Sequence, residues 1–244
     1  MQKYEVLDSI PECYKKEYIG AGTNGVCYKT SQGEVFKEFK GTFTYGRDIE
    51  ELVKIQSPFF AFPKKLVYVG QKEDNNLKGY LMDFVDGVTL SSLDRKTKID
   101  TLIQASISME KEIINLARYR GIILYYLNDV DVFIQKDNSF KAVDTECFEY
   151  APSNEAQDNI KLSMCYWSDY LLYNLALYYG AFKSDKLNLY FDIATTNGKF
   201  KASNMIEMIV DEIRKNTSNS IETLDDYYEG IKLIRRRNDI WQLL

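Results

Sequence analysis

The chain of 244 residues contains no histidine. Every mechanism that needs an imidazole as general base or metal ligand is therefore excluded, including Ser-His-Asp hydrolysis. Any acid–base chemistry must use carboxylates, lysine or tyrosine.

Cysteine is also scarce. The four thiols are scattered, with no paired C-x-x-C spacing: Cys13, Cys27, Cys147 and Cys165. This pattern argues against a disulfide framework or a zinc site, and it favours reduced thiols in the cytoplasm.

Long apolar runs are absent too, since no segment reaches the roughly 18 apolar residues that a membrane span needs. Acids at Glu5, Asp8 and Glu12 argue against a signal peptide. The net charge of −5 and pI near 5.1 disfavour a broad phosphate-binding surface. We therefore expect a cytoplasmic protein whose partners include neither nucleic acid nor membrane.

The most informative segment that is present reads IGAGTNGVCY, with glycines at Gly20, Gly22 and Gly25 followed by Val26. Glycine lets a backbone bend sharply and approach a phosphate, because no Cβ intervenes. About ten residues later, the strand-like run VFKEF carries one lysine, Lys37. A G-x-G-x-x-G-x-V loop before a strand lysine is typical of the nucleotide-binding hairpin of protein kinases.

The glycine pattern alone also fits the dinucleotide-binding turn of a Rossmann fold, where a helix follows. Here Val26, Tyr28, Val35 and Phe36 surround the turn at 31–33, which indicates strand–turn–strand instead. The kinase-type hairpin is the better interpretation.

The first 85 residues have the pattern of strands plus one helix. A short, partly helical leader at 1–17 precedes a first strand near Tyr18. Runs at Lys65–Gly70 and Gly79–Val85 predict a hairpin, and apolar residues at helical spacing predict a helix over Asp48–Ile55.

The remainder has helical periodicity. We predict helices over Ile99–Arg120, closed by Gly121 as the residue after the C-cap, and over Tyr166–Tyr179, Met205–Lys215 and Ile221–Arg237.

Together these features resemble a protein kinase-like fold over nearly the whole chain. The resemblance implies an α+β, two-lobed protein. Its N-lobe, residues 1–85, would be a small antiparallel sheet with one helix, and its C-lobe, residues 86–244, would be mainly helical.

By the same resemblance, the glycine loop with Val26 would cover ATP, and Lys37 would pair with its α- and β-phosphates. Either Asp48 or Glu51 would be the helix acid that pairs with Lys37; the sequence leaves this open.

The segment YLMDFVDGVTL resembles the hinge that meets adenine. Met82 would be the gatekeeper, and the backbones of Asp83 and Val85 would bind the base.

The segment KAVDTE resembles the strand that ends in the magnesium aspartate, here Asp144. Asp131 occupies the position of the usual asparagine ligand, and Glu146 adds a third nearby carboxylate. Oxygen ligands of this kind suit Mg²⁺ or Mn²⁺ rather than zinc.

The chain departs from the family at the catalytic loop, where Leu124-Tyr125-Tyr126 replaces His-Arg-Asp. The aspartate that accepts the substrate proton is therefore missing, and such a base typically contributes about 10²- to 10⁴-fold in rate. Asp129 is the nearby acid that a remodelled loop would bring to the substrate.

Three interpretations stay open. The first is an atypical phosphotransferase in which Lys37, Asp129 and Asp131 act in catalysis. The second is a pseudokinase that binds nucleotide as a switch or docking module. The third is a small-molecule kinase. The acceptor, whether a protein or a small molecule, is not identified by the sequence.

Overall fold

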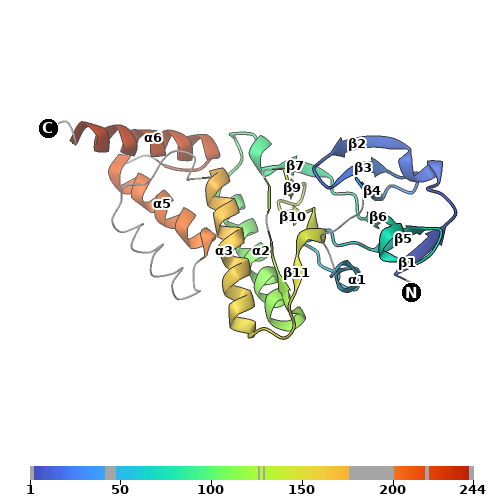
Figure 1. Cartoon of the computed structure of the whole chain (residues 1–244). Helices are drawn as coiled ribbons and strands as arrows, with labels where there is room; N and C mark the ends of the chain where they lie inside the picture. Colours follow the sequence, from blue (N-terminus) through green and yellow to red (C-terminus); the bar gives the residue numbers. More distant parts are fainter. Residues whose placement is uncertain are drawn as a thin grey trace. The chain divides into compact units, whose positions relative to one another are not determined.

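The computed structural model describes residues 3–41, 48–125, 127–128, 130–175, 201–217 and 220–241 (Figure 1). The protein is α+β, with a six-stranded mixed sheet in the N-terminal part followed by a largely helical part. It divides into two compact units, and each is described by itself. The first contains Met1–Asp86 and Lys141–Tyr150, and the second contains Gly87–Phe140 and Ala151–Leu244. The segment Lys141–Tyr150 thus lies in the unit of the sheet, apart from its sequence neighbours.

The sheet of the first unit has the strand order β1-β5-β6-β4-β3-β2. Its strands are β1 (Tyr4–Leu7), β2 (Glu17–Ala21), β3 (Gly25–Lys29), β4 (Val35–Phe39), β5 (Lys65–Val69) and β6 (Leu77–Met82). The predicted strand–turn–strand after the glycines and the predicted β5–β6 hairpin are confirmed, because both pairs are antiparallel.

The prediction of a purely antiparallel sheet is wrong. Strand β1 pairs in parallel with β5, with Tyr4 opposite Leu66 and Leu7 opposite Val69. The predicted leader therefore contains a strand, followed by a 3₁₀ turn at Glu12–Lys15. Four residues are too few for a periodicity signal, and the pairing partner is far away in the sequence.

Strand β4 lies between β3 and β6 and is buried on both faces. Because successive side chains of a strand point to opposite faces, Phe36 and Lys37 face opposite ways. Phe36 packs into a core cluster with Val67 and Leu81. Lys37 is thereby directed to the other face of the sheet.

The predicted helix over Asp48–Ile55 is reduced to the single turn α1 (Ile49–Leu52). Ile49 and Leu52 are buried, as their spacing predicts. Helices this short gain little from their own hydrogen bonds, so packing of these two residues must stabilise the turn.

The second unit contains α2 (Ile99–Arg120), α3 (Ala156–Leu175), α5 (Ala202–Thr217) and α6 (Leu224–Trp241). Helices α2 and α3 lie side by side (Figure 1). The prediction for α2 is confirmed at both ends. Gly121 closes it at φ 64° and donates its N–H to the Leu116 carbonyl. The helix predicted over Tyr166–Tyr179 corresponds to α3, which starts earlier than expected, at Ala156. The predicted end of this helix, at 176–179, lies outside the described residues.

Short elements precede α2 or lie between α2 and α3 in the sequence, and those within Lys141–Tyr150 belong to the first unit. They are β7 (Gly87–Thr89), a 3₁₀ turn (Leu90–Ser92), β8 (Ile122–Ile123), β9 (Val132–Gln135), β10 (Phe140–Ala142), a 3₁₀ turn (Thr145–Cys147) and β11 (Glu149–Tyr150). Strands β7 and β9 pair in antiparallel register.

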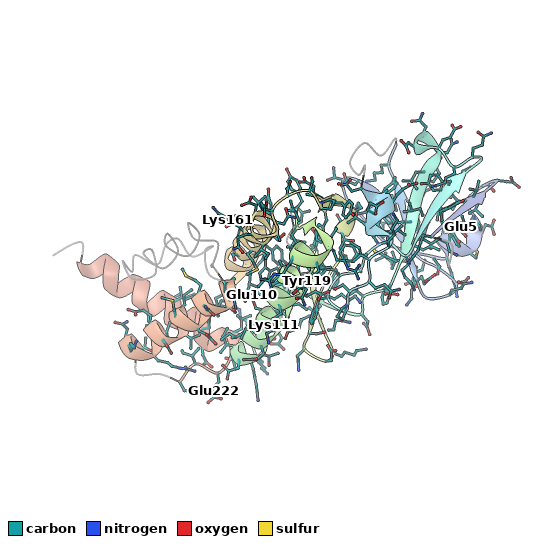
Figure 2. All side chains as sticks on the ribbon, turned by 90° about the horizontal axis from the view of Figure 1, so that it is seen from below. Glu5, Glu110, Lys111, Tyr119, Lys161 and Glu222 are labelled. Carbon is teal, nitrogen blue, oxygen red and sulfur yellow. The ribbon has the colours of Figure 1, made fainter. Side chains whose placement is uncertain are left out.

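One acid is buried inside the helical unit. Glu110 on α2, labelled in Figure 2, is 2% exposed. It accepts hydrogen bonds from the backbone N–H (3.0 Å) and the hydroxyl (2.6 Å) of Ser203, in the first turn of α5. The carboxylate therefore caps α5 and connects it to α2.

Across the described parts of the chain, no helix is long and apolar enough to cross a membrane.

Candidate functional site: an enclosed lysine and its two acids

Three side chains form a row across one face of the sheet. Cys27 on β3, Lys37 on β4 and Tyr80 on β6 are direct cross-strand neighbours. Tyr80 is fully buried and Lys37 is 3% exposed. Burial raises the pKa of the Cys27 thiol to about 11, so this cysteine stays neutral in the row. The sheet register thus fixes the lysine stem between two neutral neighbours.

The ammonium group of Lys37 is paired with two carboxylates, those of Asp144 and Glu146. The hydroxyl of Tyr80 donates to the second oxygen of Glu146 at 2.7 Å. Burial alone would lower the pKa of Lys37, but the charges of Glu146 and Asp144 outweigh it and raise the pKa. The lysine is therefore held in its charged form.

Both acids come from the segment Lys141–Tyr150, which backbone hydrogen bonds anchor to the first unit. The Ala61 N–H donates to the Ala142 carbonyl, and the Ala142 N–H donates to the Phe59 carbonyl, both at 2.8 Å. The Thr145 hydroxyl donates to the Ala61 carbonyl at 3.2 Å. These bonds fix Ala142 and Thr145, one on each side of Asp144 in the sequence.

Aromatic packing holds the far end of the same segment. Phe148 packs edge-on against Phe60 and Phe62, with ring centroids 5.6 and 6.0 Å apart. Beyond it, the Tyr150 N–H donates to the carboxylate of Asp48 at 2.9 Å. The acids are thus held at both ends by groups outside the charged cluster.

Asp144 itself has a left-handed backbone, with φ 61° and ψ 32°. Aspartate is one of the few non-glycine residues that tolerate this conformation. The bend starts the 3₁₀ turn at Thr145–Cys147, which brings Asp144 and Glu146 to the same ammonium group. Their environments differ, because the side chain of Asp144 is 31% exposed and that of Glu146 is 0% exposed.

The glycine turn connects β2 and β3 beside this cluster. It is closed by a hydrogen bond from the Gly22 N–H to the Gly25 carbonyl, at 2.9 Å. Its Asn24 side chain donates to the sulfur of Cys147 at 3.7 Å, so the turn contacts the segment that carries the acids.

The three glycines are not equivalent. A Cβ on Gly25 would lie 2.6 Å from the Glu38 carbonyl oxygen and 3.2 Å from Cγ of Lys37, whereas Gly20 and Gly22 have nothing within 4 Å. Gly25 is therefore required by the close approach of β3 to the lysine strand. The other two leave open space beside the turn.

Neither acid predicted as the partner of Lys37 pairs with it. Asp48 accepts from Tyr150, and Glu51 is paired with Lys54 at 2.5 Å on the surface. Its partners are Asp144 and Glu146, both of which the resemblance had assigned to metal. With α1 reduced to one turn, Asp48 and Glu51 make these other contacts instead.

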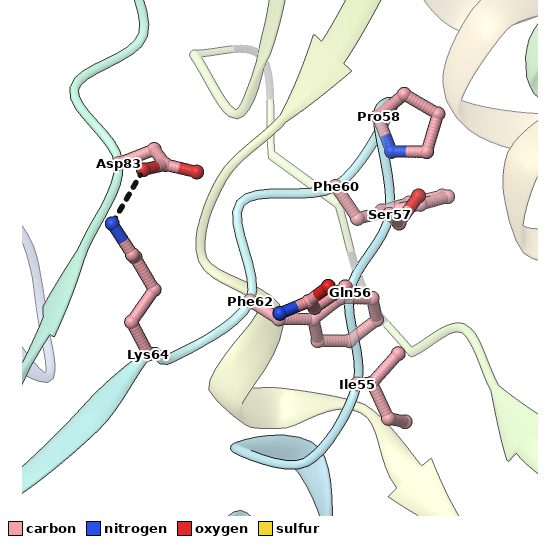
Figure 3. Close-up of a pocket in the computed structure, with 8 residues that line it drawn as sticks. All are labelled: Ile55, Gln56, Ser57, Pro58, Phe60, Phe62, Lys64 and Asp83. Atoms are coloured by element: carbon pink, nitrogen blue, oxygen red, sulfur yellow. Dashed lines mark hydrogen bonds and ion pairs between the residues drawn. The ribbon is translucent and has the colours of Figure 1, made fainter. Parts of the chain in front are cut away.

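The predicted hinge residues begin with Met82, the last residue of β6. Met82 and Val85 are buried, and the side chain of Asp83 pairs with Lys64 at 3.0 Å. This ion pair borders a cavity of about 410 Å³, shown in Figure 3. Its other lining residues are Ile55, Gln56, Ser57, Pro58, Phe60 and Phe62. Binding of adenine to this backbone stays a prediction.

The remaining predicted residues belong to the second unit. Asp131 is 4% exposed, and its carboxylate accepts from the Asn128 N–H at 2.6 Å. Tyr126 and Asp129 lie outside the described residues. Just before them, Leu124 is buried and donates its N–H to the Ser163 hydroxyl at 3.0 Å.

Of the two acids that pair with Lys37, only Asp144 is suited to bind a hard cation such as Mg²⁺. Asp144 offers a partly exposed carboxylate, whereas both oxygens of the enclosed Glu146 are already paired. Among the residues that the structure describes, no three acids or thiols gather as a ready-made metal cage. Mg²⁺ seldom needs one, because it typically takes one or two carboxylates together with substrate phosphates.

Comparison with known proteins adds no relative: no protein-family model matches the chain, and a search of curated proteins gives no match.

Proposed function

We propose that this protein binds ATP together with Mg²⁺ or Mn²⁺ in a kinase-like fold, and that it is an atypical phosphotransferase. The observation that supports this most is the enclosed Lys37, held charged by Asp144 and Glu146 next to a glycine turn. Removing an ammonium group and two carboxylates from water costs much free energy of folding. Such a cluster is therefore unusual as a purely stabilising feature.

Each part has a role in the proposal. Gly20 and Gly22 leave room for phosphate oxygens beside the turn, and Lys37 orients them. Asp144 holds the cation, which neutralises charge that develops on the phosphates. The roles of Val26, Met82, Asp83 and Val85 in covering the nucleotide, and of Asp131 as a second ligand, stay predictions.

Phosphoryl transfer depends mostly on positioning and on charge neutralisation, and the general base is a smaller part. Transfer without the family's catalytic aspartate is therefore expected to be slow, with Asp129 as the acid to test. A tyrosine at position 126 is a poor base, because its ordinary pKa near 10 leaves about one molecule in a thousand ionised at pH 7.

A second candidate is favoured by that same substitution. Leu124-Tyr125-Tyr126 in place of His-Arg-Asp is the pattern of a pseudokinase, which binds nucleotide as a switch without turnover. Both candidates require the same nucleotide site.

Transfer of labelled phosphate from ATP separates the two candidates. The full chain is incubated with Mg²⁺ or Mn²⁺ and a panel of protein, amine and sugar acceptors, with Lys37→Ala as control. Transfer that disappears in Lys37→Ala supports the phosphotransferase. Nucleotide-induced thermal stabilisation without transfer supports the pseudokinase, and the absence of both refutes the nucleotide site.

A further inference from the structure

We propose that Glu146 is the residue that positions Lys37, with Tyr80 holding it in place, and that Asp144 alone of the two acids is free to exchange the lysine for a cation. The inference rests on the proposed function and deepens it. It assigns to the segment after β10 the counter-ion role that the family resemblance gives to a helix acid.

Both carboxylate oxygens of Glu146 are already bound. One of its oxygens is paired with the Lys37 ammonium, and the other accepts from the Tyr80 hydroxyl at 2.7 Å. The side chain is 0% exposed. A carboxylate that has both oxygens bound and no contact with water has little capacity for a cation. It is instead well suited to hold one ammonium group in one place.

The two acids of the cluster differ in their exposure to solvent. Asp144 shares the same ammonium group but keeps 31% of its side chain exposed. A cation that arrives with phosphates can reach Asp144 from solvent. When Asp144 turns to that cation, Glu146 still neutralises the lysine, so the buried ammonium group is never left unpaired.

The position of Glu146 does not depend on a ligand, because Tyr80 holds the carboxylate in place. Tyr80 is fully buried on the central strand β6, directly opposite Lys37 in the β4–β6 register. The sheet therefore fixes the distance between the hydroxyl donor and the ammonium group, and Glu146 bridges the two.

The experiment measures ADP affinity of the full chain by calorimetry, once with MnCl₂ and once with EDTA. The ratio of the two affinities reports how well Asp144 is released to the cation. Glu146→Gln is compared with Asp144→Asn, Tyr80→Phe and the matched control Glu51→Gln, which changes the surface acid paired with Lys54.

We expect Glu51→Gln to keep the wild-type ratio and Asp144→Asn to lose the metal-dependent gain. In Glu146→Gln, Lys37 is left with Asp144 as its sole counter-ion and competes for that carboxylate. The gain is then expected to fall by about tenfold or more, the size expected for one charged hydrogen bond. Tyr80→Phe should give a smaller loss in the same direction.

A Glu146→Gln protein whose ratio equals that of Glu51→Gln overturns the inference, because a merely structural role would leave the ratio unchanged. If Glu146→Gln does not fold, Tyr80→Phe decides in the same assay. A Tyr80→Phe protein with the wild-type ratio then overturns the inference.

Failure of the proposed function gives a different result, namely no ADP binding by the wild type with either additive. The pairing is then tested by melting temperatures of Lys37→Met, Glu146→Gln and the double variant. Recovery in the double variant of much of the temperature lost in Lys37→Met supports Glu146 as the counter-ion. Simple addition of the two losses refutes it.

Discussion

Substitution of Gly25 by alanine tests the packing that places the glycine turn on the lysine strand. The added Cβ would lie 2.6 Å from the Glu38 carbonyl oxygen, where ordinary contact begins at 3.4 Å, so the strands must separate locally by about 0.8 Å (3.4 − 2.6). Strand β4 is hydrogen-bonded on both sides and cannot yield freely. Overpacking of this kind typically costs about 1–3 kcal/mol of unfolding free energy.

The same methyl group would lie 3.2 Å and 3.3 Å from Cγ and Cε of Lys37. We therefore expect Gly25→Ala to displace the ammonium group and to weaken nucleotide binding as well as stability. The unfolding free energy is measured by urea titration, and nucleotide affinity by calorimetry.

Gly22→Ala is the matched control, since a Cβ at Gly22 meets nothing within 4 Å. Its unfolding free energy is expected to change by no more than about 0.5 kcal/mol. Equal stability of the two variants would refute the reasoning, because the close approach of β3 to β4 would then have no energetic consequence.

Three further predictions concern the framework, and urea unfolding measures each. Phe148→Ala is expected to lose about 3–5 kcal/mol, because this ring packs the acid-bearing segment onto the sheet unit; a loss below about 1 kcal/mol, typical of surface positions, would contradict that anchoring. Gly121→Ala is expected to lose more than about 1 kcal/mol, since its φ is 64° and a Cβ would lie 2.7 Å from Cα of Pro152; a neutral result would show that the α2 C-terminus adjusts. Burial raises the pKa of Glu110 above 4.5, although the hydrogen bonds from Ser203 lower it in part. The folded protein therefore binds this proton more tightly than the unfolded chain, and stability declines as pH rises from 4.5 toward the folded pKa. Glu110→Gln should remove that decline, and an unchanged pH profile would contradict the assignment.

Local sequence signals predicted the elements that depend on local physics. The periodicity of Ile99–Arg120 and the glycine after it specify α2 and its left-handed end, and both are confirmed. The glycine spacing and the single lysine of VFKEF identified the turn and the strand that form the cluster. These signals act within one element, so no knowledge of the partner elements was needed.

Features that depend on distant partners could not be predicted in this way. The parallel pairing of β1 with β5 joins segments far apart in the sequence, and the strand is four residues long. The pairing of Glu146 with Lys37 depends on the left-handed bend at Asp144 and on a tyrosine from β6. No local pattern distinguished Tyr80 from the other residues of an apolar strand.

We propose above all that Lys37 and its acids form a binding site for a nucleoside triphosphate with a divalent cation. The most direct test is calorimetric titration of the full chain with a non-hydrolysable ATP analogue and Mn²⁺, beside Lys37→Ala. We predict saturable binding that requires the cation and is lost in Lys37→Ala. Absence of heat from any purine nucleotide at millimolar concentration, or equal binding by Lys37→Ala, would contradict the claim.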